Sequence, residues 1–296
     1  MASRAQIAKP DIIQTFETLP KILKLRDIES ALNEHRKFWR LTNSTTVKDF
    51  VNFLREKTQL VPITIPFPQR AVVGFTWGPQ PLLEVLLGLA ENSFLSHYTA
   101  MRIHGLTEQV PKTVYLNQEK NENSATYSSH EKLFDQPAID SAFLRPPRHS
   151  QNMAEYEGTR ILFLQSAYHA GLGITSSDVN LGGDRDLTLR HTTLERTLID
   201  IVVRPFYAGG VFEVAKAFEQ ARTTVSVNTM AAMLKKLGHG YPYHQAIGYY
   251  LERAGYRPGQ VDLFRKIPRE RDFYLTHQMA AARYVEAWRL YVPEGF

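Results

Sequence analysis

The 296-residue chain is 43% hydrophobic and 11% aromatic, which is enough to bury a large core, and its length predicts one large domain or, as we favour, two. It has no cysteine, which excludes disulfides, a thiol nucleophile and cysteine-ligated zinc. The formal net charge is +5, and the excess lies in the first quarter, where residues 1–80 hold 12 Lys and Arg against 7 Asp and Glu. Such asymmetry indicates a domain that faces a polyanion, or else an ordinary solvated surface.

The basic first quarter has the periodicity of two helices that meet at a short polar turn. Apolar residues recur at helical spacing from Ile22 to Leu32. A second helix is expected after Asn43 and Ser44, which supply N-cap chemistry. Its buried face would consist of Val47, Phe50, Val51 and Leu54, and its opposite face of Thr45, Lys48, Asn52 and Arg55.

Two β-rich runs follow at 61–65 and 71–77, and the intervening PFPQR predicts a hairpin with Gln69 and Arg70 at its tip. Helix, turn, helix and basic hairpin is the order of a winged helix-turn-helix, whose second helix enters the major groove of DNA. We therefore predict base contacts from Thr45, Lys48, Asn52 and Arg55. Phosphate contacts are expected from Arg36, Lys37, Arg40, Lys57, Gln69 and Arg70. The same unit could instead serve as a dimerisation or partner-docking module.

After a proline-containing step at 78–81, the stretch FLSHYTAMRIHGLTEQVPKTVYL at 94–116 brings serine and histidine together. We expect Ser96 to cap a helix that carries His97 and His104, and Gly105 to end it in the left-handed conformation before a strand. A serine nucleophile would need a base within reach and an oxyanion hole. Because neighbouring side chains on a helix point about 100° apart, Ser96 and His97 are not expected to act together. This stretch therefore predicts scaffold, not catalysis.

A further helix is predicted from Leu194 to Val203, and Arg204-Pro205 would stop it. Arg196 and Asp200 have the i,i+4 spacing of an ion pair, and we expect a charge network that holds this helix to the preceding strand at 186–192. The alternative is a metal-binding carboxylate set that combines Glu195 and Asp200 with Asp184 or Asp186. Gly209-Gly210 predicts a tight turn between helices, because no phosphate-binding motif accompanies it.

Three segments of the chain resemble one protein family. The sequence SHYTAMRIHGLTEQVPKTVYL at 96–116 resembles the helix, HGL turn and strand that open the C-terminal region of AbiEi-type antitoxins of type IV toxin-antitoxin and abortive-infection operons. Residues 192–221 are similar to that family's ERTL-[IL]-D helix and the GG-started helix after it, and residues 273–295 to its closing strand. The resemblance covers most of residues 80–296. Its motif residues here are Ser96, His104, Gly105, Glu195, Arg196, Asp200, Gly209 and Gly210.

Together, pattern and resemblance predict an α+β protein of two domains, with a winged helix-turn-helix over 1–80 and a larger mixed α/β antitoxin domain over 81–296. The resemblance implies that the chain binds double-stranded DNA of its own operator, at inverted repeats, represses transcription and counteracts a nucleotidyltransferase-like toxin, with or without direct contact. We expect no enzymatic activity, cofactor or bound metal. No apolar run approaches the roughly 18 residues of a membrane span, so a cytoplasmic location without membrane contact is expected.

Two alternatives from other functional classes remain open. One is a protein-interaction subunit of a phage-defence assembly, in which the basic first quarter docks an acidic protein. The other is a metal-dependent nuclease or phosphotransferase that uses Asp184, Asp186, Glu195 and Asp200. The polar stretch at 119–131 is predicted to form a surface loop.

Overall fold

The computed structural model describes residues 3–122 and 134–296, so most of the polar stretch at 119–131 lies outside the described residues. The chain forms two compact units, each built of helices and strands, and the fold is α+β as expected. The first unit comprises residues 1–92 together with 154–158. The second comprises residues 93–153 and 159–296.

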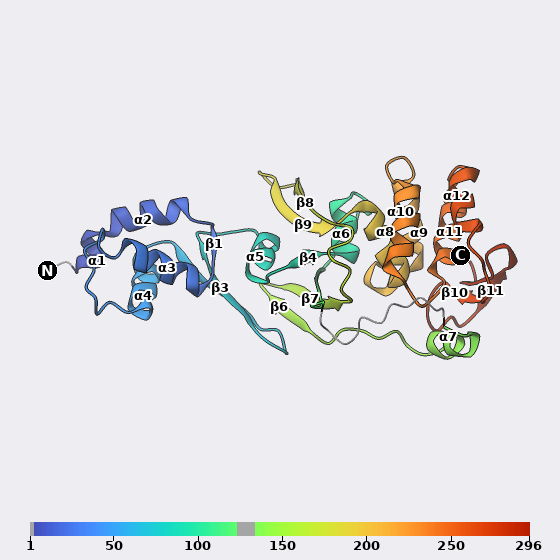
Figure 1. Cartoon of the computed structure of the whole chain (residues 1–296), viewed down its shortest axis with the longest axis horizontal. Coiled ribbons are helices and arrows are strands. Elements are labelled where there is room, and N and C mark those ends of the chain that lie inside the picture. The colour runs from blue at the N-terminus through green and yellow to red at the C-terminus, as the bar shows by residue number, and fades with distance from the viewer. Residues whose placement is uncertain (1–2, 123–133) are drawn as a thin grey trace. The chain divides into compact units, whose positions relative to one another are not determined.

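The first unit combines helices with a three-stranded antiparallel sheet of order β1-β3-β2 (Figure 1). Its helices are α1 (Arg4–Ile7), α2 (Lys9–Thr18), α3 (Leu25–His35), α4 (Val47–Lys57) and α5 (Leu82–Leu89). Its strands are β1 (Ile22–Leu23), β2 (Leu60–Ile65) and β3 (Val72–Trp77). The pairing of β2 with β3 runs from Leu60 opposite Trp77 to Ile65 opposite Val72, which confirms the expected hairpin.

Aromatic packing explains why the elements of the first unit hold together. The Phe16 ring of α2 stacks on Trp77 of β3 at 4.9 Å between centroids, and Trp39 stacks on Phe50 of α4 at 5.5 Å. All four side chains are at most 2% exposed. Ile22, which the periodicity placed in a helix, lies in β1 instead, because pairing with Thr76 of β3 completes a short strand before α3 begins.

Helix α5 belongs to the first unit because it packs closely on β1 and β3. A Cβ atom at Gly74 of β3 would lie 2.2 Å from the Leu89 side chain, and one at Gly88 would lie 2.8 Å from Ile22. Only glycine permits these approaches, since neither distance leaves room for a methyl group. The proline step at 78–81 is therefore a turn within this unit.

Five strands of the second unit belong, with β6, to a six-stranded mixed sheet of order β6-β7-β5-β4-β9-β8, in which β5–β7 and β4–β9 are parallel. Its strands are β4 (Ser93–Leu95), β5 (Thr113–Glu119), β6 (Met153–Tyr156), β7 (Thr159–Ser166), β8 (Ile174–Val179) and β9 (Leu187–Thr192). The outer strand β6 reaches into the 154–158 segment that clusters with the first unit. A second sheet of order β10-β12-β11 is formed by β10 (Phe273–Tyr274), β11 (Ala282–Val285) and β12 (Leu290–Pro293), where a single closing strand was expected.

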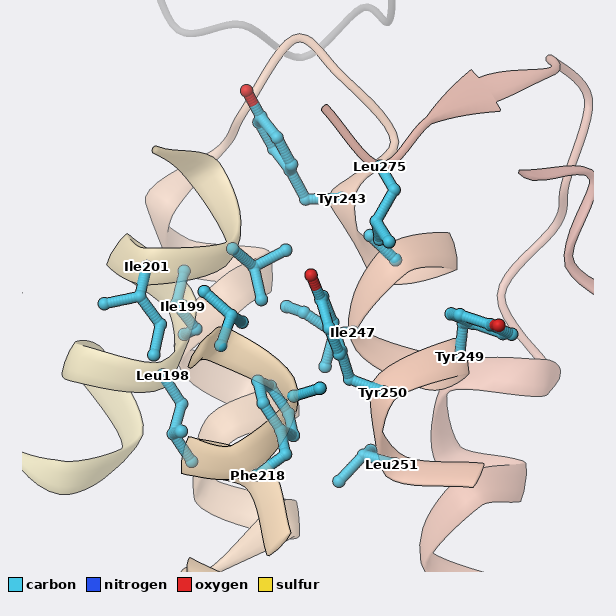
Figure 2. Close-up of a cluster of buried hydrophobic side chains, with 14 of the residues drawn as sticks. Leu198, Ile199, Ile201, Phe218, Tyr243, Ile247, Tyr249, Tyr250, Leu251 and Leu275 are labelled. Carbon is cyan, nitrogen blue, oxygen red and sulfur yellow. The ribbon is translucent and has the colours of Figure 1, made fainter. Parts of the chain in front are cut away.

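Helices supply most of the core of the second unit. They are α6 (His97–Ile103), α7 (Gln136–Phe143), α8 (Leu194–Val203), α9 (Val211–Ala221), α10 (Val227–Leu237), α11 (Tyr243–Arg253) and α12 (Pro258–Arg265), with the 3₁₀ turns η1 (Pro205–Tyr207) and η2 (Glu286–Trp288). Leu198 and Ile201 of α8 lie with Phe218 of α9 and Ile247 and Tyr250 of α11 in one apolar cluster (Figure 2). No helix within residues 3–122 and 134–296 is both long and apolar enough to cross a bilayer.

Candidate nucleic-acid interface

The turn between α3 and α4 is held by its own side chains. Thr46 is the N-cap of α4 and forms a capping box with Asp49: the Asp49 backbone N–H donates to Thr46 Oγ1 at 3.1 Å, and the Thr46 backbone N–H donates to Asp49 Oδ2 at 3.3 Å. The Thr46 hydroxyl also donates to Asp49 Oδ2, at 2.7 Å. The expected caps, Asn43 and Ser44, lie in the preceding turn, so that prediction was wrong by two to three residues. The spacing of a threonine three residues before an acidic residue is the signal that identifies the true cap.

Arg36, one of the expected phosphate contacts, uses its guanidinium group for hydrogen bonds within this turn. Its Nη1 donates to the carbonyl oxygens of Thr42 at 2.7 Å and Thr45 at 3.0 Å. Thr45, an expected base contact, is half-buried, and its hydroxyl lies 2.9 Å from that of Thr42. Both residues therefore shape the turn that presents α4, and their polar groups are already engaged.

The remaining base-contact candidates lie on one exposed stripe of α4. Lys48, Asn52 and Arg55 follow one another at spacings of four and three residues, and all three are exposed. The opposite face is buried through Phe50, whose side chain is 1% exposed, and Leu54, which is fully buried. We name Lys48, Asn52 and Arg55 the α4 stripe.

Charges in the first unit divide into paired and unpaired cations. Lys21 bonds to Glu17 at 2.7 Å, and Lys24 and Arg26 share Glu91. Within the described part of the chain, a second set forms no ion pair: Lys37, Arg40, Lys48, Arg55, Lys57 and Arg70. The hydrogen bond from Lys24 lowers the pKa of the Glu91 carboxyl, and that from Lys21 lowers the pKa of Glu17, so both carboxylates stay ionised and hold their partners at neutral pH. Those six come from positions expected to contact DNA, whereas Arg4 of α1 and Lys9 of α2 also form no ion pair with a described residue and were not expected to do so.

The β2–β3 hairpin carries the last two candidates. Gln69 and Arg70 are exposed in its connection at 66–71. Phe67, which is 4% exposed, anchors the start of this connection, and its N–H donates to the Ile65 carbonyl at 3.0 Å. Phe67 therefore anchors the start of the connection, and the polar and basic side chains at its tip remain accessible to a partner.

In the second unit, Ser96 and His97 are in contact, contrary to expectation. Ser96 Oγ lies 2.9 Å from His97 Nδ1, and Ser96 makes no side-chain cap to α6 although it occupies the N-cap position. The reason is the φ of His97, +49°, which lies outside the right-handed helical range, so the angular separation of a regular helix does not apply. Burial lowers the pKa of His97 to about 4, against the opposing effect of Asp200. Ser96 is fully buried and His97 is 4% exposed, which suits a structural role and leaves a substrate no access.

The other motif residues of the α6 region anchor that helix. His104 Nε2 lies 2.7 Å from the Thr192 carbonyl at the end of β9. Gly105 ends the helix with a φ of +65°, as the sequence predicted.

The ion pair of α8 is confirmed and deeply buried. Arg196 Nε donates to Asp200 Oδ1 at 2.8 Å, and the two side chains are 4% and 10% exposed. Arg196 Nη1 also donates to the Leu172 carbonyl at 2.7 Å, in the loop before β8. The expected charge contact to the preceding strand was wrong: α8 is tied to β9 by the hydroxyls of Thr192 and Thr197, 2.7 Å apart.

The carboxylates proposed for a metal-dependent nuclease or phosphotransferase do not form one cluster. Glu195 accepts from the Ser226 N–H at 3.0 Å, Asp200 is paired with Arg196, and Asp184 and Asp186 lie in the exposed turn between β8 and β9. No three His, Asp or Glu side chains in the described ranges are grouped so that they could hold a metal ion.

The glycine pair before α9 forms a tight turn. Gly209 and Gly210 have φ values of +79° and +91°, and the Gly210 N–H donates to the Pro205 carbonyl at 2.8 Å. That donor is consumed within the turn, which is unlike a phosphate cradle, where backbone N–H groups point at the ligand.

Comparison with known proteins shows the fold but not a family. No family model matches the chain, and no curated protein matches it. Its structure is similar to that of the Rv2827c protein from Mycobacterium tuberculosis, with a TM-score of 0.60 and 13% sequence identity, over 96% of this chain and 90% of that one. The similarity shows that nearly the whole chain shares an α+β fold with that protein.

Proposed function

We propose that this protein is a sequence-specific DNA-binding repressor whose first unit is a winged helix-turn-helix. The order α2, β1, α3, α4, β2, β3, with the sheet order β1-β3-β2, supports the proposal because the second helix of such a unit is followed by a two-stranded wing. In this arrangement α4 enters the major groove, and the β2–β3 hairpin lies along the backbone.

The division between paired and unpaired cations carries the proposal. Lys21, Lys24 and Arg26 are neutralised by Glu17 and Glu91. Six of the unpaired cations, in contrast, lie on α4, at the α3–α4 turn and at the hairpin tip, and two others, Arg4 and Lys9, lie on α1 and α2. A cation without an internal partner retains its full charge for a phosphate, and each phosphate neutralised releases condensed counterions.

The α4 stripe has the chemistry needed to read bases. Asn52 can form two hydrogen bonds with adenine, and Arg55 two with guanine, each worth about 1–3 kcal/mol of discrimination against the wrong base. Lys37, Arg40, Lys57 and Arg70 would contact phosphates and fix the register of the helix in the groove. Arg36 is assigned to the turn instead, because both of its hydrogen bonds go to carbonyl oxygens of that turn.

The antitoxin role is the second part of the proposal and rests on the sequence resemblance to AbiEi-type antitoxins. In this role the protein binds inverted repeats of its own operator and counteracts a nucleotidyltransferase-like toxin. Co-expression with the product of a neighbouring gene tests it: the toxin alone should arrest growth, and this protein should relieve the arrest. Growth arrest that persists with the protein present would remove the antitoxin role while leaving DNA binding untouched.

DNA binding is tested with a fluorescent duplex from the protein's own upstream region, against a scrambled duplex, at about 50–200 mM salt, where phosphate contacts lose orders of magnitude in affinity. We expect a preference for the native duplex that persists at the higher salt. A variant with Lys48→Ala, Asn52→Ala and Arg55→Ala should lose this preference. The matched control, Lys21→Ala with Arg26→Ala, removes two paired cations and should bind like the wild type. Equal affinity for both duplexes would remove the repressor role and favour the interaction module.

A further inference from the structure

A basic pocket of about 570 Å³ lies within the second unit. Its wall is assembled from four separated parts of the chain: residues between 138 and 148, the end of α8 with η1, the start of α11, and His277. This volume falls within the range of about 300–1,000 Å³ that is typical of small-molecule sites.

The charged side chains in the described lining of the pocket are positive. Three arginines, Arg145, Arg148 and Arg204, line the pocket, and none of its lining residues within 3–122 and 134–296 is an aspartate or glutamate. All three are exposed, and among residues 3–122 and 134–296 none of their guanidinium groups has an ion-pair partner. Three unpaired guanidinium groups around one cavity repel one another, and a multiply charged anion would relieve that repulsion.

Aromatic side chains complete the wall. Phe206 and Tyr241 are half-buried, and Tyr243 is 8% exposed. Figure 2 shows the Tyr243 hydroxyl directed away from the apolar cluster formed by α8, α9 and α11. Burial raises the pKa of both tyrosine hydroxyls, while the charge of Arg204 acts on Tyr243 and that of Arg148 on Tyr241 in the opposite direction. The arginines and the rings line the same pocket.

Internal hydrogen bonds fix the backbone that carries these arginines. His277 Nδ1 contacts the carbonyl oxygens of Ala142 at 3.2 Å and Arg145 at 3.1 Å; carbonyls only accept, so Nδ1 carries the proton. The His277 ring also stacks on Phe143, with 4.4 Å between centroids. Arg204 is the C-cap of α8, and its N–H donates to the Asp200 carbonyl at 3.0 Å. A fixed wall lowers the entropic cost of binding.

We propose that this pocket binds a nucleoside polyphosphate. The forked guanidinium groups of Arg145, Arg148 and Arg204 hold the phosphate oxygens, since their geometry allows two parallel hydrogen bonds to one phosphate. The Phe206 and Tyr241 rings hold the base. The limited volume favours a free nucleotide over a nucleic-acid chain.

The test is titration calorimetry of the full-length protein with ATP, GTP, CTP and UTP in turn, and with inorganic pyrophosphate. At least one nucleotide should bind with a sub-millimolar Kd, and at least tenfold more tightly than pyrophosphate. Arg148→Ala and Arg204→Ala should each weaken that binding at least tenfold. The matched control, Arg257→Ala, removes an exposed arginine outside the pocket and should bind like the wild type. Thermal unfolding of each variant checks that it is folded.

Three results would overturn the proposal. The first is the absence of heat with every nucleotide at millimolar concentration. The second is pyrophosphate binding as tightly as the best nucleotide, which would leave the rings without a role. The third is a short single-stranded RNA that binds more tightly than any nucleotide and loses affinity in Arg204→Ala, which would assign the pocket to a polymer. None of these results depends on whether the first unit binds DNA.

Discussion

Helices α4 and α8 are similar in length and both carry arginine, yet the two arginines have opposite surroundings. Arg55 of α4 is exposed and has no ion pair with any described residue. Arg196 of α8 is 4% exposed and is held by Asp200 and by the Leu172 carbonyl. The comparison teaches that the fold decides whether a cation can meet a ligand, because a guanidinium group whose donors are satisfied internally has little left for an external phosphate.

The largest effect is expected where the buried pair of α8 is broken. Asp200→Ala should lower the free energy of unfolding of the second unit by about 3–5 kcal/mol, because it leaves the Arg196 charge buried without its partner. Urea unfolding measures this loss. The double variant Arg196→Met with Asp200→Leu removes both charges and should lose less. A single variant as stable as the wild type would contradict the structural role of the pair.

Acid should also weaken the second unit, through His97. Its folded-state pKa of about 4 lies below the ordinary histidine value of 6.5, so the unfolded chain takes up a proton at a higher pH than the folded chain does. The contribution of neutral His97 to the free energy of unfolding is present above about pH 6.5 and is lost as the pH falls toward 4. About 2 kcal/mol of it is lost by pH 5.

Urea unfolding at pH 7 and pH 5 measures the contribution of His97. His97→Asn removes the titrating group while keeping a residue that tolerates positive φ, so its stability should fall less between the two pH values. The same pH dependence in variant and wild type would show that other groups cause the acid sensitivity.

The exposed member of the comparison, Arg55 of α4, is tested by its removal. Arg55→Ala should reduce the preference for operator over random DNA by about 1–3 kcal/mol, because it removes a base contact and leaves the contacts that stabilise the fold in place. Paired binding titrations on the two duplexes measure it. An equal loss of affinity on both would move Arg55 to the phosphate contacts.

The smallest change in specificity is expected for Lys57→Ala. This variant should weaken binding to all DNA alike and reduce the salt slope by about one unit. Lys21→Ala is its control, since Lys21 is already paired with Glu17. If both variants lost the same affinity, the distinction between paired and unpaired cations would have no functional meaning.

Several local features could be predicted from the sequence. The structure confirms four expected features: the buried apolar face of α4, the β2–β3 hairpin, the left-handed Gly105 and the Arg196–Asp200 pair. Each depends on residues only a few positions apart, whose geometry is fixed by helix and strand repeats. The α4 cap was missed, although its pattern is equally local.

Contacts between distant segments could not be predicted. The occupation of Arg36 by the α3–α4 turn and the contact of Ser96 with His97 depend on backbone dihedrals that no residue pattern specifies. The pocket arginines were missed for a related reason: Arg145 and Arg204 are far apart in sequence, and the packing of α7, α8 and α11 brings them to one cavity. The Arg-Pro-Pro-Arg run at 145–148 was the visible signal.

By itself, the sequence determined the amphipathic faces, the turns and the excess of positive charge in the first quarter, because these follow from residue type and short-range periodicity. Only the tertiary structure decided that α5 joins the first unit, which cations are neutralised and which stay free, and where three arginines surround a cavity. Those outcomes depend on packing between segments distant in the chain, and burial and pairing become defined only when that packing is complete.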